Sequence, residues 1–213
     1  MASTTILNTN QTSKSVVLYL IRGFVCIIKE RKQKTQMQHE DIPAGANAPR
    51  EVNTIVEVPK GSSNKYKYSP ASNIFRYDHT LFSPLHYPCD YGWICGTKAD
   101  GRPRPLSVLV MSSNPTFCGC LIVARPVGAL LMNDHRGEDP KILSVAVADP
   151  RFDSIHSLSD LSEHTLLEIQ HFFEIYQVLE QHEVEILGWE DAHDTHARIA
   201  AAVGKTQQRT EGV

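Results

Sequence analysis

Short segments typical of β-strands follow one another between residues 53 and 147, and this pattern limits the fold more than any other feature of the chain. Most are rich in Val, Ile and Tyr, and Gly or Pro residues separate them, as in Pro59-Lys60-Gly61. The predicted strands are residues 53–58, 65–68, 74–77, 106–111, 121–131 and 142–147. Such a series favours a small, closed or nearly closed antiparallel β-structure.

The pattern becomes helical after Asp160. Ser162 is a suitable N-cap residue, and apolar side chains follow it at intervals of three and four. The residues that share this apolar face are Leu166, Ile169, Phe173, Tyr176 and Leu179. We expect the face to pack against the β-structure, and a second short helix to follow at residues 191–203. The fold class predicted is therefore α+β.

Charge is unevenly distributed along the 213 residues, although the formal net charge is only -3. Residues 1–36 contain six bases and one acid, which gives +5. The rest of the chain contains 15 of the 21 bases and 23 of the 24 acids, which gives -8. An acidic body disfavours nucleic acid as a partner and is suited to binding cations.

The basic segment 1–38 is predicted to be an extension separate from a main domain at residues 39–203. Its apolar run, residues 16–28, is interrupted by Arg22 and is shorter than the roughly 20 residues that span a bilayer, so no transmembrane span is predicted. Three interpretations remain: an organellar transit peptide, a membrane-surface helix, or an appendage upstream of a true start at Met37, which we prefer. Residues 204–213 are predicted to form a polar tail without regular structure.

Five cysteines are present, and none forms a CxxC pair. Neither a disulfide framework nor a cysteine zinc site is therefore expected, and a reducing compartment, the cytoplasm, is predicted. Targeting of the chain to an organelle by residues 1–36 is the alternative. We interpret Cys118 and Cys120 as structural thiols.

Two acidic clusters could bind a metal ion. The loop that follows the strand predicted at residues 121–131 carries Asp134, Glu138 and Asp139, followed by Lys141, and such carboxylates can bind Mg²⁺ together with phosphate oxygens. A solvated acidic turn is the alternative interpretation. The second cluster consists of Asp191, His193, Asp194 and His196. We interpret it as the solvent-exposed face of the last helix.

Several stretches, taken together and in order, resemble the family I soluble inorganic pyrophosphatases. The resemblance covers residues 40–203. The stretches that carry it are residues 41–45, 57–66, 75–78, 81–83, 86–92, 100–101, 125–128, 137–139 and 171–176. The resemblance implies a small OB-like antiparallel β-barrel with flanking C-terminal helices, and hydrolysis of pyrophosphate to two phosphates by bound Mg²⁺ ions.

The resemblance also implies roles for individual residues. Asp100, Asp134 and Asp139 correspond to metal-binding carboxylates, with Glu57 as an outer-shell acid of the same site. The residues expected to contact phosphate are Lys65, Tyr91, Lys141 and Tyr176. Tyr87 is expected nearby as an active-site tyrosine, and Tyr87 and Asp100 are the residues expected to take part in catalysis. A homo-oligomer is also expected.

The chain departs from the family in its sharpest signature, Asp-x-Asp-Pro-x-Asp. Two residues are inserted into the corresponding run, so the middle aspartate falls on Arg102 or Arg104 and the last on Ser107. Three further departures are Lys67 for an acid, His79 for a phosphate-binding Arg, and Gln177 for a Lys. These changes remove negative charge from the metal site. Two hypotheses follow: a Mg²⁺-dependent pyrophosphatase, attenuated by the changes, or a catalytically silent phosphate- or nucleotide-binding relative or partner subunit.

Overall fold

The computed structural model describes residues 16–21, 24–29, 38–99, 104–134, 137–179 and 184–210, with side chains described from residue 38 to residue 203 except at the gaps and at residues 177–179. The chain divides into two compact units, Met1–Gln36 and Met37–Val213, and each is described by itself. In the first unit, β1 (Val16–Ile21) and β2 (Phe24–Lys29) pair antiparallel. The interpretation of this segment as a membrane-surface helix is therefore wrong. Within the described residues, no helix has both the length and the apolar character needed to cross a membrane.

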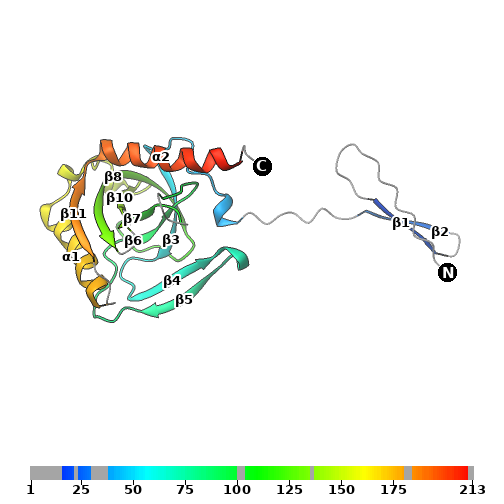
Figure 1. The fold of residues 1–213 in the computed structure, drawn as a ribbon, viewed down its shortest axis with the longest axis horizontal. Helices are drawn as coiled ribbons and strands as arrows, with labels where there is room; N and C mark the ends of the chain where they lie inside the picture. The colour runs from blue at the N-terminus through cyan, green and yellow to red at the C-terminus, as the bar shows by residue number, and fades with distance from the viewer. Residues whose placement is uncertain are drawn as a thin grey trace. The chain divides into compact units, whose positions relative to one another are not determined.

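Five strands of the second unit close into a ring, as Figure 1 shows. In order around the ring these strands are β3 (Val52–Val58), β6 (Asp90–Ile94), β7 (Ser107–Met111), β10 (Lys141–Ala146) and β8 (Leu121–Asp134). Four neighbouring pairs are antiparallel, but β10 and β7 are parallel. A closed ring with an odd number of strands cannot alternate direction throughout. The predicted barrel is thus confirmed, but its sheet is mixed rather than antiparallel.

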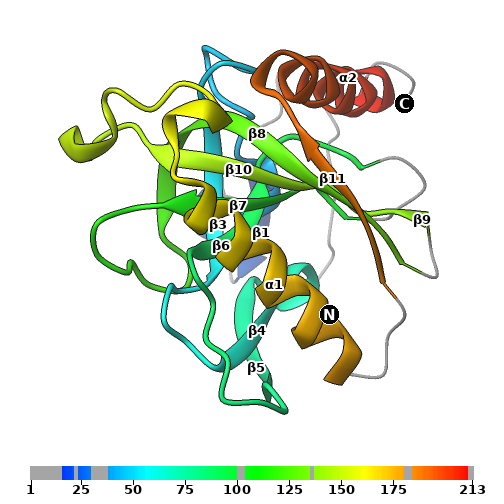
Figure 2. The same ribbon diagram turned by 90° about the vertical axis from the view of Figure 1, so that its left-hand side faces the viewer.

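The remaining elements surround the barrel. β11 (Glu185–Glu190) and the short β9 (Gly137–Glu138) both pair with β8, and β4 (Asn64–Ser69) forms a separate hairpin with β5 (Ile74–Thr80). Figure 2 shows α1 (Glu163–Leu179) running along the side of the barrel and α2 (Ala192–Thr210) lying across one end of it. Four 3-10 turns complete the described elements: His39–Asp41, Pro70–Ser72, Pro150–Phe152 and Leu158–Asp160.

All six predicted strands are present, but three strands of the main sheet, β6, β11 and the short β9, are missing from the prediction. Residues 86–92 read as a turn because Pro88 and Gly92 break the pattern, whereas β6 begins within them at Asp90. β11 has a glycine, Gly188, in the left-handed region at a bulge, which conceals its strand character in the sequence. α2 also continues to Thr210, beyond the predicted end at residue 203, so the prediction of an unstructured segment there is wrong. Gly204 disfavours the helix by only about 1 kcal/mol.

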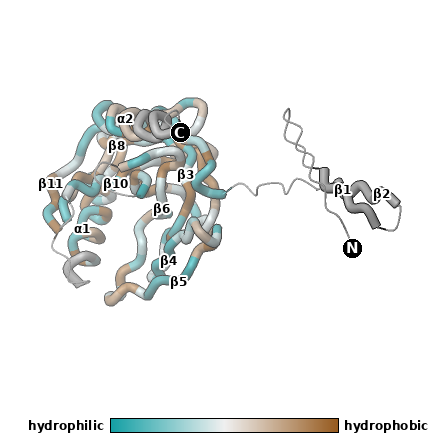
Figure 3. The backbone as a smooth tube through the Cα atoms, turned by 45° about the vertical axis from the view of Figure 1, so that its right-hand side comes forward, coloured by the Kyte–Doolittle hydropathy of each residue, from teal (hydrophilic) through white to brown (hydrophobic). Residues whose placement is uncertain are grey.

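Helix α1 follows the sequence prediction closely. The Ser162 hydroxyl accepts a hydrogen bond from the Thr165 backbone N–H at 3.2 Å, which caps the helix. Ile169, Phe173 and Tyr176 of the predicted face are buried in the core together with Phe172. Burial of such a side chain contributes about 1.5–3 kcal/mol. Figure 3 maps the hydropathy of these elements along the chain.

Strands β3 and β6 approach each other closely at Gly92, which lies opposite Val56. A Cβ atom at Gly92 would lie 1.8 Å from the carbonyl oxygen of Ile55. Because a backbone oxygen cannot rotate away as a side chain can, only glycine fits here. The ring therefore depends on this residue.

We predict that Gly92→Ala destabilises the barrel by more than about 3 kcal/mol, because the strands must separate to admit the methyl group. Gly61→Ala is the control: its Cβ meets nothing within 4 Å, and only the left-handed φ of +78° opposes it, at a cost of about 1–2 kcal/mol. Urea unfolding monitored by circular dichroism measures both. Equal losses in the two variants would contradict the steric explanation.

Candidate active site

Glu57 lies at an irregularity of strand β3. The register between β3 and β6 shifts between Val56 and Val58, which leaves Glu57 as the extra residue of a bulge. Its carboxylate accepts a hydrogen bond from the Tyr68 backbone N–H at 2.9 Å. Burial raises the pKa of Glu57 above its ordinary value, although this hydrogen bond and the nearby Arg104, Lys65 and Lys67 charges oppose the shift. The bulge thus directs a half-buried acid toward the β4–β5 hairpin.

The hairpin brings Lys65 to helix α1. Lys65 Nζ donates a hydrogen bond to the Tyr176 hydroxyl and lies 4.9 Å from the centre of the Tyr176 ring. The hairpin itself contacts the barrel through aromatic rings: Tyr68 and Phe75 pack on Trp93 of β6, with centroid distances of 5.4 and 5.9 Å. This packing fixes the place of Lys65, so two residues that are 111 positions apart meet as predicted for one site.

Buried tyrosines continue the site toward the barrel. The Tyr87 ring lies 6.3 Å from Tyr176 and 5.5 Å from Tyr91. The Tyr91 hydroxyl donates a hydrogen bond of 3.2 Å to the hydroxyl of Ser107, the position at which the sequence resemblance places the family's last aspartate. Ser107 is buried, so it offers a neutral oxygen at this point in place of a charged one.

The strongest ion pair of the site is buried. Lys141 Nζ lies 2.7 Å from Asp139 Oδ2, and the two side chains are 3% and 7% exposed. The same ammonium lies 5.9 Å from the Tyr91 ring centre and 5.8 Å from that of Phe173. Breaking such a pair by removal of one partner costs about 3–5 kcal/mol, because the other charge stays buried. The pair therefore holds Asp139 firmly in place.

Arg104 brings a second cation to the same carboxylate. Its Nη2 lies 3.4 Å from Asp139 Oδ2, and the Arg104 side chain is 54% exposed. Burial lowers the pKa of Arg104, but Tyr91, Asp139, Glu57 and Asp134 outweigh it and raise that pKa above the ordinary value. Arg104, one of the two arginines that the sequence places at the missing middle aspartate, thus lies among the predicted metal-binding acids.

Asp134 is placed by strand pairing. It is half-buried, ends β8 and pairs with Gly137 of β9, which carries the chain directly back to Asp139. Asp139 in turn donates its backbone N–H to the Met132 carbonyl at 2.7 Å. The two predicted metal ligands Asp134 and Asp139 thus lie on the two sides of one turn.

Two other departures from the family lie together on the hairpin. Lys67 Nζ and His79 Nδ1 contact the same oxygen of Asp78, at 2.8 and 2.9 Å. The Lys67 hydrogen bond is the main reason that the pKa of Asp78 lies below its usual value. Sequence reasoning gave Asp78 no role, because only the fold shows that its carboxylate contacts both residues.

Some predicted site residues lie outside the described part of the chain. These are Asp100, Arg102 and the Gln177 side chain. Their expected roles stay predictions.

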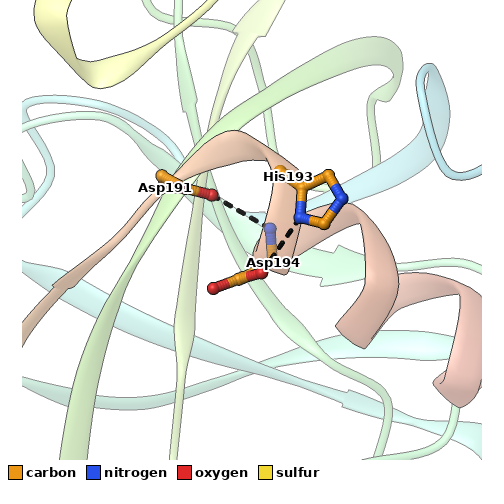
Figure 4. Close-up of side chains that lie close together, drawn as sticks. All are labelled: Asp191, His193 and Asp194. Atoms are coloured by element: carbon orange, nitrogen blue, oxygen red, sulfur yellow. Dashed lines mark hydrogen bonds and ion pairs between the residues drawn. The ribbon is translucent and has the colours of Figure 1, made fainter.

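The cluster near the start of α2 has a structural explanation (Figure 4). Asp191 accepts the Asp194 backbone N–H at 3.0 Å, which caps the helix, and His193 Nδ1 lies 3.0 Å from Asp194 Oδ1. Among the described residues these three form the one group of acids, histidines or cysteines whose ligand atoms lie within 4.8 Å of one another. All three are exposed, as expected for a solvated helix face, and His196 is not part of the group.

The thiols of the Cys118-Gly119-Cys120 turn are half-buried, and burial raises the pKa of Cys118 to about 11. The backbone of this turn accepts the Val56 N–H and donates to the Val56 carbonyl, at 3.0 and 2.8 Å. The turn therefore completes the hydrogen bonding of β3 beside the Glu57 bulge.

Comparisons with known proteins agree with the barrel and with the family resemblance expected from the sequence. A family model described as inorganic pyrophosphatase matches residues 54–207. The inorganic pyrophosphatase of Halalkalibacterium halodurans is 47% identical over 145 residues, which are 68% of this chain and 88% of that protein. For the Haloferax volcanii inorganic pyrophosphatase the identity is 46% over 153 residues, 71% of this chain and 86% of that protein.

A crystal structure supports the same conclusion. The inorganic pyrophosphatase of Thermus thermophilus superposes with a TM-score of 0.77 at 36% identity, over 80% of this chain and 99% of that one. The fold is thus that of a barrel hydrolase of phosphoric anhydrides. The chain belongs to the inorganic pyrophosphatase family, and the predicted resemblance to family I is confirmed.

We predict that Glu57→Gln stabilises the protein at neutral pH, because the amide still accepts the Tyr68 N–H but carries no charge to bury. The folded pKa of Glu57 is raised, so the folded state holds the proton more tightly and the contribution of Glu57 to stability falls as pH rises through that pKa. The advantage of the variant should therefore vanish at a pH below the unfolded pKa of about 4.3 and grow above it. Urea unfolding from pH 4 to pH 8 measures the difference. A constant difference across this range would contradict the burial effect.

Proposed function

We propose that this chain hydrolyses inorganic pyrophosphate to two phosphates with Mg²⁺, at a rate lowered by its own substitutions. One observation carries the proposal: lysine and tyrosine donors and the acids Asp139, Asp134 and Glu57 lie around one site in a member of this family. The donors are Lys65, Tyr176, Tyr91 and Lys141. Acids and phosphate donors side by side suit a substrate that arrives as a complex of phosphate and cation.

The residues present fit a hard cation. The Arg104 guanidinium lies among Asp139, Glu57 and Asp134, so this part of the site already stabilises a positive charge. Carboxylate oxygens are the ligands that Mg²⁺ takes in proteins, with waters and phosphate oxygens completing its shell. We propose that Asp134 and Asp139 hold Mg²⁺ and that Glu57 contacts its waters. When bound, the ion lowers the pKa of a water and neutralises phosphate charge.

The chain's own donors are proposed to hold the phosphates. Lys141 and Lys65 supply positive charge. The hydroxyls of Tyr91 and Tyr176 can donate hydrogen bonds to phosphate oxygens without first gaining or losing a proton. Tyr87 packs between the two tyrosine rings and orients them. The expected role of Asp100 in catalysis stays part of the proposal on the strength of the resemblance alone.

Two substitutions are proposed to slow the reaction by different amounts. The Arg104–Asp139 contact is long, and the Arg104 side chain is half exposed. Such a pair contributes about 1 kcal/mol or less. A cation can therefore displace Arg104 with a loss of less than about tenfold in the affinity of the site for that cation. Ser107 has a larger effect because it removes a carboxylate altogether. A hydroxyl does not balance the charge of adjacent cations, nor does it accept a proton from the attacking water.

We predict that the purified protein releases phosphate from pyrophosphate with Mg²⁺ and that EDTA stops this release. Asp139→Asn should lower kcat/KM by more than about 100-fold, since it removes a proposed cation ligand. Asp153→Asn, at an exposed 3-10 turn, is the control and should change the rate by less than about twofold. Far-UV circular dichroism establishes that the variants are folded. A folded wild-type protein without turnover above buffer would contradict the proposal and favour a silent relative.

We predict that Ser107→Asp raises kcat by more than about tenfold, because it restores the missing charge and proton acceptor. Arg104→Gln should mainly lower the Mg²⁺ concentration for half-maximal rate, by less than about tenfold, since the arginine competes for Asp139. Arg151→Gln removes an exposed arginine away from the site and is the matched control. Phosphate release as a function of Mg²⁺ concentration separates the two effects. A Ser107→Asp variant no faster than wild type would contradict the assignment of this position.

The wider organisation is also proposed. We infer a basic extension at residues 1–38, a pyrophosphatase domain at residues 39–203 and a polar tail, with the tail beginning inside α2 rather than after it.

Exposed apolar side chains on the barrel, such as Leu121, Val123 and Phe117, support a homo-oligomer. We retain the cytoplasm as the proposed compartment, with no nucleic-acid partner.

A further inference from the structure

Arg198 of α2 connects two acidic side chains that come from different strands. Its Nε and Nη2 donate to the two oxygens of Glu190 at 3.0 and 2.7 Å. The same Nη2 lies 3.0 Å from Glu138 Oε1. Since Nη2 carries two hydrogens, one can serve each carboxylate, and only the planar fork of arginine offers this geometry.

The Glu190 side of this connection is fixed. Glu190 is 12% exposed and also accepts a hydrogen bond from the Thr195 hydroxyl at 3.4 Å. Arg198 is 26% exposed, and its hydrogen bonds to Glu190 and the Glu138 charge raise its pKa above the ordinary value. Glu138 is more exposed, at 48%. Arg198 is therefore an anchored cation, and Glu138 is the group that it holds.

Glu138 lies in β9, in the stretch between the two proposed Mg²⁺ ligands. In the β8–β9 pairing, Asn133 is opposite Glu138 and Asp134 is opposite Gly137, and Asp139 follows directly. Gly137 has a φ of +100°, in the left-handed region that favours glycine. Figure 2 shows β9 at the margin of the sheet, beyond the body of the barrel. A tether to Glu138 thus limits how far Asp134 and Asp139 can separate.

We propose that Arg198 is a positioning residue that holds the β8–β9 turn through Glu138 and so keeps Asp134 and Asp139 at the separation that binds Mg²⁺. Arg198 touches neither acid and acts only through the turn. The inference rests on the proposed function in one respect, the assignment of Asp134 and Asp139 as cation ligands.

Glu138→Ala removes the tether and leaves the Arg198–Glu190 pair intact. Glu185→Ala is the matched control, because Glu185 is also an exposed acid that contacts this turn, through Asn133 Nδ2 at 3.4 Å, but does not reach Arg198. Mg²⁺ alone is titrated into each protein by calorimetry, and exchange of the Asp139 amide hydrogen is followed without metal. We expect Mg²⁺ affinity about tenfold weaker in Glu138→Ala and less than about twofold changed in Glu185→Ala. Exchange at Asp139 should be faster in Glu138→Ala alone.

Kinetics separate positioning from general destabilisation. The Mg²⁺ concentration for half-maximal rate should rise about tenfold in Glu138→Ala while kcat at saturating Mg²⁺ changes by less than about twofold. Arg198→Lys, which keeps the charge but not the fork, should be intermediate. If Glu138→Ala and Glu185→Ala have equal Mg²⁺ affinity and equal exchange at the Asp139 amide, the inference about Arg198 is overturned. Turnover by the wild type would still support the proposed function in that case. Mg²⁺ binding without turnover in the wild type would overturn the proposed function alone, and no Mg²⁺ binding would overturn both.

Discussion

Strand β8 is the constraint on which the rest of the structure depends. Its 14 residues pair with β3 near one end, with β10 and β11 along the middle and with β9 at the other end. Because one strand closes the ring and then continues past it, the turn with Asp134 and Asp139 extends from a rigid element. Displacement of β8 would therefore disturb both the barrel and the proposed cation ligands.

Closure also explains where charge can be buried. β10 lies between β7 and β8, so its first residue, Lys141, enters the ring beside Ser107 of β7. The ammonium is accepted there because Asp139, two residues earlier, provides the opposite charge at 2.7 Å. A buried pair of this kind contributes little net stability but strongly resists the loss of either member. The fold thus holds the Lys141 charge, which we propose binds phosphate, in place without making it the main source of stability.

The sequence predicted the elements whose signal is local and missed those whose signal is not. Helix α1 was predictable because its cap and apolar face repeat at helical spacing, and the six strands because Gly and Pro separate them. β6 and β11 were missed since each contains a glycine that the fold requires at one point: Gly92 at a close approach and Gly188 at a bulge. The parallel β7–β10 pair follows from ring closure, which no stretch of sequence displays. The site residues were predicted from motifs that follow one another along the chain in the family's order. The contacts of Asp78 and Arg198 are visible only in the folded structure.

Charge near the site shows why the position of a substitution matters more than its sign. Lys67 and Arg104 both bring positive charge to places where the family has an acid, yet they differ in effect. Lys67 is paired with Asp78 on the hairpin, at 2.8 Å, so its charge is partly offset there, although it still acts on Glu57. Arg104 instead contacts Asp139 itself, where it competes with any bound cation. Ser107 changes the charge least, by one unit, but it lies buried where water and protein cannot replace the lost carboxylate. We therefore expect the neutral substitution to limit catalysis more than the two cationic ones.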